Sequence, residues 1–367
     1  MDFNPSDLQR MLQDSAERFV AERFTLEHRR DLRESSDGSD HEAWQQFAEL
    51  GWLMLLVPEE LGGLGGTMTD AAVLSAVLGS RCVAEPFASS AVLGATILAG
   101  ATEPPSDLIA GLIAGEMRPA LAHDEPGERY SYASSRSCRL QDDGTELFLE
   151  GQKLTAWDAP SATHLIVTAS SQNAPCLLLV PKNAAGVSCT DYALYDGSRA
   201  ADVHFERVRL GQENILARGN SAVQLLGLAL DRTRLCLAAQ SLGSIEAELE
   251  LCSAYLKERQ QFGQPIGKFQ SLQHIMADMF VAAHQARSIL YFALSQMEGP
   301  EQERTRAVNL ARLQIAEAGQ LVSRQAIQLH GGYGVTDEYE VSHHYRRQLI
   351  LEKQYGDVDF AIRSVQP

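Results

Sequence analysis

The sequence has 367 residues, a formal net charge of −17 and 45% hydrophobic residues, which is enough for a large core divided between two or three subdomains. A field this negative opposes binding to nucleic acid or to an anionic membrane, although a polyanionic cofactor needs only a local basic pocket. No apolar run approaches the length of about 18 residues typical of a membrane-spanning helix, so we expect no membrane span.

The amino terminus and the cysteines both indicate a cytoplasmic protein. The first residues, MDFNPSDLQR, have neither the apolar segment of a signal peptide nor the Arg/Ser bias of a transit peptide. Because no two cysteines form a Cys-x-x-Cys pair, we expect reduced, mostly buried thiols and neither a disulfide framework nor a zinc site. The cysteines are Cys82, Cys138, Cys176, Cys189, Cys236 and Cys252.

The predicted elements divide the chain into a helical domain (1–117), a β domain (118–215) and a second helical domain (216–367). In the first, NPSDLQRMLQDSAERFVAERF places Ser6 at a helix start before apolar residues at helical spacing, and DHEAWQQFAELGWL repeats the pattern. The glycine-rich stretch VPEELGGLGGT is not followed by G-x-x-x-x-G-K-[ST], so we expect a structural loop, with a phosphate cradle as the alternative.

The middle part of the chain has the pattern of short strands. CRLQDDGTELFLEGQKLTA alternates polar and apolar residues around the turn signal Asp142-Asp143-Gly144, which predicts a hairpin. Four more segments are strand candidates: THLIVTAS, CLLLVPK, GVSCTDY and ADVHFERVRL. We expect a compact all-β unit of about 90 residues, a barrel or a sandwich, between the helical parts.

The last part keeps helical apolar spacing along three long segments, which begin at Ala222, Ser271 and Arg306. Long amphipathic helices in succession are typical of an antiparallel bundle. The expected fold class is therefore α+β, with a C-terminal four-helix bundle.

Two stretches narrow the class of protein. ERQQFGQPIGKFQSLQHIMADM carries Arg-x-x-Phe-Gly at Arg259, then Gln270 and a helix with Ala-Asp-Met. QLHGGYGVTDEYEVSHHYRR carries Gln-x-x-Gly-Gly-x-Gly at Gln328, then Glu-Tyr and an arginine, Arg346. At this spacing the two stretches together resemble the acyl-CoA dehydrogenase family, and the resemblance extends over essentially the whole chain.

The resemblance implies FAD bound between subunits. It implies that Arg259 pairs with the FAD pyrophosphate, because a guanidinium fork suits phosphate oxygens. Phe262 and Gln270 would line the dinucleotide tail, and Gln328 would bond the diphosphate or the adenosine part. Gly331-Gly332 would let the backbone approach phosphate without a Cβ in the way. If HGGYG occurred without the other motif, it would indicate a helix C-cap. If Arg259 occurred alone, it would indicate a solvated charge at a helix end.

The catalytic base of the family is absent from both of its usual positions. Family members remove the α proton of an acyl-CoA thioester with a glutamate, while a hydride leaves the β carbon for the flavin. At the usual position this sequence has Tyr355, and a phenol with a pKa near 10 is a poor base at neutral pH. At the alternative position Thr233 precedes Arg234. We therefore predict no catalytic base in this chain and interpret Tyr355 as a packing side chain beside the thioester site.

The β domain also departs from the family. Asp124 replaces the threonine before Glu125-Pro126-Gly127, and Thr155-Ala156-Trp157 replaces a Trp-Ile-Thr. These changes weaken the contacts that a subunit normally makes with its own flavin ring. The chain is thus similar to the small, base-lacking subunits of hetero-oligomeric enzymes, such as pimeloyl-CoA dehydrogenase or the steroid-degrading acyl-CoA dehydrogenases. This implies an acyl-CoA substrate, a second acyl-CoA dehydrogenase-like chain in an α2β2 assembly that supplies the glutamate, and an electron-transfer flavoprotein or similar acceptor.

Other titratable residues have simpler interpretations. Three carboxylates near the missing bases, Asp231, Glu352 and Asp357, could replace a base, but surface or helix-terminal charges are expected. No carboxylate or cysteine stands at ligand spacing from His343-His344, so we expect an exposed helix face and no metal. The pair Arg346-Arg347 fits a solvated helix face as well as a CoA phosphate site.

Three functions remain open at this point. The chain is a flavin-dependent acyl-CoA dehydrogenase subunit that works with a different partner chain, a baseless flavoenzyme of the same fold with oxygen chemistry, or a non-catalytic scaffold subunit. The residues that would line an acyl pocket carry no diagnostic motif, so the sequence does not identify the acyl group as fatty, dicarboxylic or steroid-derived.

Overall fold

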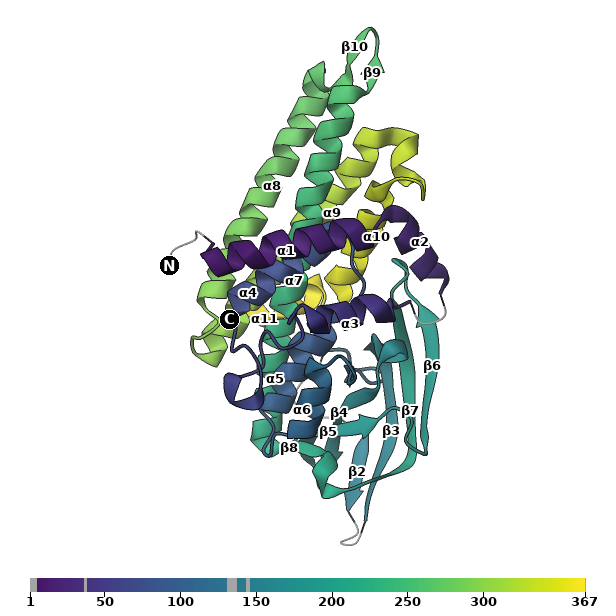
Figure 1. Ribbon diagram of the computed structural model, residues 1–367, viewed down its shortest axis with the longest axis vertical. Helices are drawn as coiled ribbons and strands as arrows, with labels where there is room; N and C mark the ends of the chain where they lie inside the picture. Colours follow the sequence, from purple (N-terminus) through teal and green to yellow (C-terminus); the bar gives the residue numbers. More distant parts are fainter. Residues whose placement is uncertain (1–4, 36–37, 131–136, 143–145, 367) are drawn as a thin grey trace. The chain divides into compact units, whose positions relative to one another are not determined.

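The computed structural model describes residues 5–35, 38–130, 137–142 and 146–366, which form two compact units (Figure 1). The helical unit contains residues 5–31, 68–83 and 234–366, and the sheet unit contains residues 32–67 and 84–233. Along the chain, helices precede the strands and helices follow them, which confirms the predicted α+β order. The domain boundaries at 117/118 and 215/216 stay a prediction.

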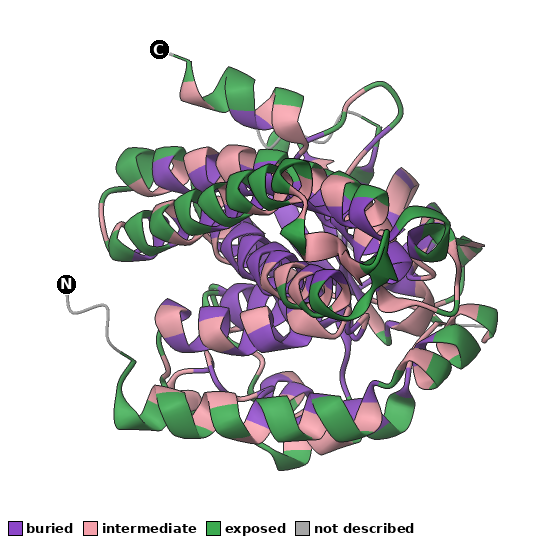
Figure 2. Ribbon diagram, turned by 90° about the horizontal axis from the view of Figure 1, so that it is seen from above, coloured by how far each residue is buried: buried purple, intermediate pink, exposed green. Residues whose placement is uncertain are grey.

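The helical unit is built on long helices, of which α7 is shared with the sheet unit and is largely buried (Figure 2). Its elements are α1 (Asp7–Arg23), most of α2 (Leu26–Glu34), α4 (Met68–Ser80), α7 (Gly219–Glu258) from Arg234 onward, β9 (Gln260–Gln261), β10 (Gln264–Pro265), η5 (Ile266–Lys268), α8 (Gln270–Ser295), α9 (Glu301–His330), η6 (Gly331–Val335), α10 (Glu340–Lys353) and α11 (Val358–Val365).

Local chemistry explains where these helices begin and how closely they pack. Ser6 caps α1 as predicted, since its Oγ accepts from Gln9 N at 3.1 Å while Gln9 Oε1 accepts from Ser6 N at 3.0 Å. Helices α4 and α7 touch backbone to backbone: a Cβ on Gly79 would lie 2.0 Å from the oxygen of Gln240, and one on Gly243 would lie 1.8 Å from the oxygen of Ala76. Glycine at both positions therefore allows the close crossing that buries α7.

The sheet unit carries short helices and one eight-stranded sheet in the order β6-β7-β3-β2-β4-β5-β8, with β1 parallel to β4. The elements are α3 (His41–Glu49), η1 (Glu59–Leu61), η2 (Phe87–Val92), α5 (Leu93–Ala99), α6 (Ser106–Ile113), β1 (Pro119–Ala122), β2 (Arg139–Asp142), β3 (Leu147–Trp157), η3 (Ala159–Ser161), β4 (His164–Ser171), β5 (Ala174–Pro181), β6 (Val187–Ala193), β7 (Arg199–Leu210), η4 (Gln212–Asn214) and β8 (Ile215–Arg218).

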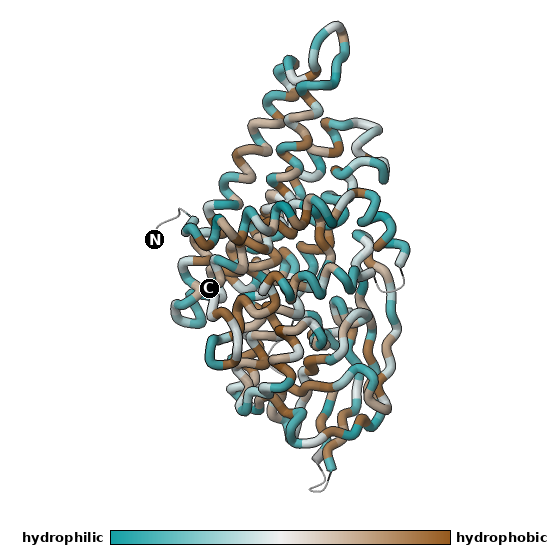
Figure 3. Tube along the Cα trace, in the orientation of Figure 1, coloured by the Kyte–Doolittle hydropathy of each residue, from teal (hydrophilic) through white to brown (hydrophobic). Residues whose placement is uncertain are grey.

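The predicted strands correspond to β2–β7, and their apolar residues form the core of the sheet, seen as brown stretches in Figure 3. The predicted hairpin is confirmed as the antiparallel pair β2–β3, while the turn residues 143–145 lie outside the described residues. The loop VPEELGGLGGT folds back on itself: a Cβ on Gly63 would lie 2.0 Å from the oxygen of Val57, and Gly66 N donates to Leu55 O at 2.8 Å. Its glycines thus serve packing, as expected for a structural loop.

Across the ranges that the structure describes, no helix has both the length and the apolar content to cross a membrane.

Candidate functional site

The Arg-x-x-Phe-Gly motif forms a tight hairpin at the end of α7, seen at the top of Figure 1. We call residues 259–265 the tip hairpin. Arg259 N still donates to Tyr255 O at 2.8 Å, and Ile266 N donates back to Arg259 O at 2.8 Å. The side chain of Arg259 is exposed and forms no hydrogen bond or ion pair with another residue that the structure describes, so its five donors are available to a ligand.

Phe262 and Gly263 form the two-residue turn of this hairpin, with φ of +52° and +77°. Positive φ at both central residues defines a type I′ turn, which favours asparagine and glycine, whereas a bulky residue with positive φ is strained. Phe262 is nevertheless 92% exposed and contacts only Phe269 edge-on, at 6.1 Å between ring centroids, among the aromatic pairs of the described chain. A strained, exposed aromatic side chain gains little from its own chain, which favours a contact with another molecule.

The three glycines of HGGYG have three different physical roles. Gly331 ends α9 with φ +59°, a conformation that side chains rarely adopt, and Gly334 lies so close to α9 that a Cβ would be 2.9 Å from Ile327 O. Gly332 has neither constraint: its φ is not positive, and a Cβ would meet nothing within 4 Å. We call residues 331–335 the glycine turn. The backbone at Gly332 is not covered by other atoms, so a ligand could approach it closely.

Gln270 and Gln328 complete the predicted cofactor residues. Gln270 is the first residue of α8, directly after the tip hairpin and η5, and Gln328 lies in the last turn of α9, directly before the glycine turn. Both side chains are exposed. All six predicted residues therefore lie on the surface of the helical unit, at the ends of α7, α8 and α9.

Tyr355 follows α10 in a turn that two buried arginines hold. Arg234 Nε donates to Tyr355 O at 2.7 Å, and Arg312 Nη2 lies 2.8–3.2 Å from four carbonyl oxygens of this turn. These four belong to residues 351, 352, 354 and 356. Tyr355 itself is buried and has φ +57°. Because both arginines bind main-chain oxygens, they fix the path of the backbone and not the identity of the side chain at 355.

The alternative base position offers no base either. Thr233 is fully buried in α7, and its hydroxyl donates to the carbonyl oxygen of Ala229 at 2.7 Å, the usual bond of a threonine inside a helix. A threonine hydroxyl is not a base at neutral pH, and this one already donates within the helix, so Thr233 is a structural residue of α7.

The three carboxylates weighed as substitutes are engaged or enclosed. Asp357 caps α11 by accepting from Phe360 N at 2.8 Å, which confirms a helix-terminal role. Glu352 also has a helix-terminal position, in the last turn of α10, but it is buried and accepts from Gln320 Nε2 at 2.6 Å and Lys353 Nζ at 2.8 Å. The expectation of a surface or helix-terminal charge is wrong for Asp231, which is 1% exposed in the interior of α7.

The expected exposed face at His343-His344 is wrong, because α10 packs against α9 and buries both rings. His343 Nε2 donates to Asp337 O at 3.1 Å, and burial lowers the pKa of His343 to about 4. His344 Nδ1 contacts Ser244 Oγ at 2.8 Å and Cys82 Sγ at 3.2 Å, and burial lowers its pKa well below the usual value. Both rings are therefore neutral parts of the core near pH 7.

The expected solvated face at Arg346-Arg347 is wrong for the same reason. The Arg346 side chain is 12% exposed, pairs with Asp337 and donates to Ser342 Oγ at 2.9 Å. Arg347 is buried and donates to Gln240 Oε1 at 3.1 Å. Charged residues on a buried helical face are stable only when paired in this way.

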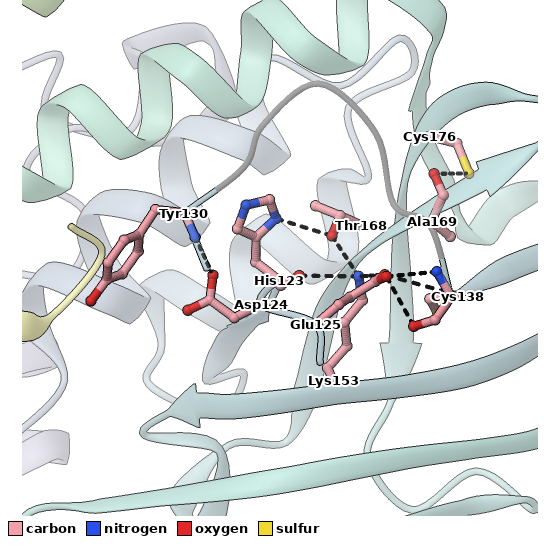
Figure 4. Close-up of polar contacts among 10 residues, drawn as sticks. His123, Asp124, Glu125, Tyr130, Cys138, Lys153, Thr168, Ala169 and Cys176 are labelled. Carbon is pink, nitrogen blue, oxygen red and sulfur yellow. Dashed lines mark hydrogen bonds and ion pairs between the residues drawn. The ribbon is translucent and has the colours of Figure 1, made fainter. Parts of the chain in front are cut away.

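A buried ion pair anchors the end of β1 in the sheet unit (Figure 4). Lys153 is fully buried and donates to Glu125 Oε1 at 2.6 Å, Thr168 Oγ1 at 2.9 Å and His123 O at 3.1 Å, which uses all three of its N–H groups. Glu125 Oε2 accepts from Ser137 N at 2.6 Å and Ser137 Oγ at 2.9 Å. Every partner is satisfied, which is the condition under which a buried ion pair is tolerated.

The residues that differ from the family in the β domain have local roles. Asp124 Oδ1 accepts from Tyr130 N at 2.9 Å, so this carboxylate closes the loop after β1 (Figure 4). Thr155 has φ +48° and donates its N–H to Asp202 Oδ1 at 2.9 Å, while Trp157 is buried at the end of β3. Asp124 and Trp157 thus both take part in the packing of the sheet unit itself.

Sequence reasoning missed Lys153, Arg312 and Glu248. Lys153 lies an even number of residues from the buried Leu147 and Leu149 in β3, so strand alternation would have predicted that it is buried. Glu248 lies four residues from Ser244 and from Cys252 on the buried stripe of α7, and neither carboxylate oxygen has a hydrogen-bond partner among the described residues. Burial raises its pKa well above the usual range. Since Glu248 lies fifteen positions after Thr233, about four helical turns, it does not replace a base there.

Comparisons with known proteins identify the family to which this fold belongs. Sequence profiles of the acyl-CoA dehydrogenase N-terminal and C-terminal domains match residues 6–116 and 222–363. The chain is 30% identical over 326 residues to the probable acyl-CoA dehydrogenase YngJ of Bacillus subtilis, covering 85% of each. It superposes on the ChsE4-ChsE5 complex of Mycobacterium tuberculosis with a TM-score of 0.89 and 25% identity, covering 100% of this chain and 98% of that one. For a variant of the Tcur3481-Tcur3483 steroid ACAD the TM-score is 0.88 and the identity 27%, with 98% and 96% covered.

The fold is that of a flavin-dependent acyl-CoA oxidoreductase, with a helical, a β-sheet and a second helical domain. The chain belongs to the acyl-CoA dehydrogenase family and is an oxidoreductase of that family. Members of the family depend on FAD. The outward donors of Arg259 and the open backbone of Gly332 fit a phosphate-bearing cofactor.

Proposed function

We propose that this chain is the base-lacking subunit of a heteromeric acyl-CoA dehydrogenase, in which a second, homologous chain supplies the glutamate that removes the α proton. The observation that carries the proposal is the turn at Tyr355. Arg234 and Arg312 hold its backbone, but it presents a phenol, and the hydroxyl of Thr233 is bonded within α7. A phenol with an ordinary pKa near 10 does not deprotonate a thioester at neutral pH.

In this proposal the helical unit holds the dinucleotide of FAD. Arg259 pairs with the pyrophosphate, and Gly331-Gly332 lets the backbone approach it. Phe262 and Gln270 line the tail, and Gln328 bonds the diphosphate or the adenosine part. When bound, FAD would supply the acceptor for the hydride that leaves the β carbon of the acyl-CoA. This chain's contribution to catalysis is therefore to hold and orient the cofactor.

The exposed surface of the helical unit supports an assembly with a partner. Besides Phe262 at the tip, α8 exposes Phe280 (55%), Val281 (53%) and Phe292 (45%). Large apolar side chains gathered on one helix are typical of an interface. We expect a dimer of heterodimers, with an electron-transfer flavoprotein or similar acceptor. Two structural neighbours are a two-component complex and a steroid ACAD, which supports the heteromeric assembly and makes a steroid-derived acyl-CoA one candidate substrate.

The test is co-expression with a family member that carries the catalytic glutamate, sought first among the neighbouring genes, followed by measurement of subunit stoichiometry, a flavin spectrum and single-turnover flavin bleaching with acyl-CoA. We expect an equimolar, flavin-loaded complex that bleaches, and a chain that does not bleach alone. A stable flavin-loaded monomer would contradict the assembly. Oxygen consumption by the chain alone would favour the baseless flavoenzyme, and absence of flavin and activity from every mixture would favour the scaffold.

A further inference from the structure

We infer that Tyr333, in the glycine turn, is the platform on which the adenine ring of FAD stacks. This inference rests on the proposed function, because it names the residue with which the same site recognises the purine half of the cofactor.

Four aromatic rings, one of them Tyr333 in the glycine turn, form a closed cycle in the helical unit. His330 lies 4.4 Å from Tyr255 and 4.9 Å from Tyr339, between ring centroids. Tyr333 lies 4.5 Å from Tyr339 and 6.5 Å from Tyr255. Each ring therefore contacts two others, and together they fix the orientation of the Tyr333 ring. A ring that is already ordered loses little conformational entropy when a ligand binds it.

Tyr333 differs from the other three rings in its exposure. Its side chain is 47% exposed, whereas His330 is buried and Tyr255 and Tyr339 are partly buried. His330 and Tyr339 are uncharged near pH 7, because burial lowers the pKa of His330 and raises that of Tyr339 to about 12. Tyr333 thus presents a flat, neutral, supported surface to the outside, which suits an uncharged purine.

The cycle also joins the two halves of the predicted FAD site. The carbonyl oxygen of Tyr255 accepts from Arg259 N at 2.8 Å, so the cycle begins one helical turn before the predicted pyrophosphate ligand. Gly332, with open space at its Cβ position, directly precedes Tyr333, and Gln328 is exposed one turn earlier. An aromatic plane beside an amide and a bare backbone offers stacking, an edge hydrogen bond and room for a phosphate.

The backbone of the turn holds Tyr333 in place. Thr336 donates to Tyr333 O through both its Oγ1, at 2.9 Å, and its N, at 3.3 Å. These bonds are independent of the Tyr333 ring, so a change of that side chain leaves the turn intact.

The test measures binding of FAD, FMN and ADP to the full chain and to its complex with the partner, for Tyr333→Leu and Tyr333→Phe. FMN lacks the adenosine and ADP lacks the flavin. We expect Tyr333→Leu to weaken FAD and ADP about tenfold and to leave FMN unchanged, because loss of one base–aromatic stack has that size. Tyr333→Phe keeps the ring and should bind FAD within about twofold of the wild type. Tyr195→Leu is the matched control, an exposed tyrosine (62%) of the sheet unit.

The outcomes separate this inference from the proposed function. If wild type binds FAD and Tyr333→Leu binds FAD and ADP equally tightly, the adenine platform is wrong and the proposed function stands. An equal loss of FMN and FAD would mean damage to the turn and would also overturn the inference. A wild-type chain and complex that bind neither FAD nor ADP overturn both. If Tyr333→Leu instead changes only the subunit stoichiometry, Tyr333 belongs to the partner interface and the inference is wrong.

Discussion

Arg234 and Tyr355 are joined by a hydrogen bond of 2.7 Å from the guanidinium Nε to the main-chain oxygen. The same guanidinium lies over the ring of Phe360, 4.7 Å from its centroid, and a Cβ on Gly356 would come within 3.3 Å of its Nη2. Arg234 therefore holds the turn through main chain and packing. Changes to the Tyr355 hydroxyl can be made without loss of this bond.

The first prediction concerns Tyr355→Phe in the reconstituted complex. At pH 7 only about one part in a thousand of an ordinary phenol is ionised. If the partner supplies the base, the substitution removes no proton transfer and should change single-turnover flavin bleaching by no more than about threefold. Replacement of the partner's glutamate by glutamine should cost about 10²–10⁴-fold. A Tyr355→Phe complex that binds flavin and acyl-CoA but does not bleach would identify the phenol as the base.

The second prediction concerns Arg259→Ala. Loss of a charge-assisted bond to the pyrophosphate should weaken FAD binding by about 1.5–3 kcal/mol, roughly ten- to a hundredfold. Absorbance of the complex after gel filtration measures flavin retention. Arg18→Ala is the control, because Arg18 is an exposed arginine on α1 whose Nε donates to the main-chain oxygen of Asp14 in its own helix. Equal flavin retention in both variants would exclude a role for Arg259 in holding FAD.

The third prediction uses the three glycines of the glycine turn. Gly332→Ala should leave thermal stability unchanged or raise it slightly, by about 0.4–1 kcal/mol, because nothing lies within 4 Å of the new Cβ. It should nevertheless weaken FAD binding. Gly331→Ala and Gly334→Ala should both destabilise the chain, the first through its φ of +59° and the second through contact with Ile327 O. Normal FAD binding by a stable Gly332→Ala variant would contradict ligand approach at this position.

The fourth prediction concerns acid stability. The folded pKa of His343, about 4, lies below the ordinary value of 6.5, so between these values the unfolded chain binds more protons than the folded one. Stability should therefore fall as pH drops below 6.5, by up to about 1.4 kcal/mol per pH unit for this residue, and level off below pH 4. Denaturant unfolding from pH 4 to 8 measures this slope. His343→Gln, which retains a donor for Asp337 O, should have a shallower one; an unchanged slope would exclude His343 as its source.

The fifth prediction concerns the buried ion pair. Lys153→Met leaves the carboxylate of Glu125 buried without its cation and should lower the free energy of unfolding by about 3–5 kcal/mol. The exposed pair of Arg209 and Glu146, also 2.6 Å apart, is the matched control, and Arg209→Met should have only a small effect. Chemical denaturation of the two variants gives the comparison. Similar losses in both would show that burial does not set the strength of the Lys153 pair.

The sequence predicted the fold well because its signals were periodic and local. Ser6 with Gln9 marks the start of α1, and the alternation in 147–157 marks β3. The motif around Arg259 and Gly331-Gly332 was recognised through its resemblance to the acyl-CoA dehydrogenase family, because each half alone would indicate a helix C-cap or a solvated charge. Its residues prove to be exposed on one unit, at the ends of three helices.

The buried polar residues could not be predicted in the same way. In the sequence, the charged and polar pairs His343-His344 and Arg346-Arg347 resemble a solvated helix face. In the structure this face of α10 packs into the core, where Arg347 bonds Gln240 and His344 bonds Ser244, both of α7. These hydrogen bonds join helices about a hundred residues apart in sequence, so no local sequence pattern predicts them. The same holds for Arg312, whose partners are main-chain oxygens that any sequence would offer.

The clamp of Arg234 and Arg312 on the turn at position 355 has an evolutionary consequence. Since the hydrogen bonds of Arg234 and Arg312 to this turn go to carbonyl oxygens, they do not depend on the side chain at position 355. After a gene duplication, one copy could lose an acid there, or regain it, through change at a single codon while its stability and its cofactor surface stay intact. One substitution at this position could then separate the two roles: one copy would supply the base, and the other would keep its fold and its cofactor-binding surface.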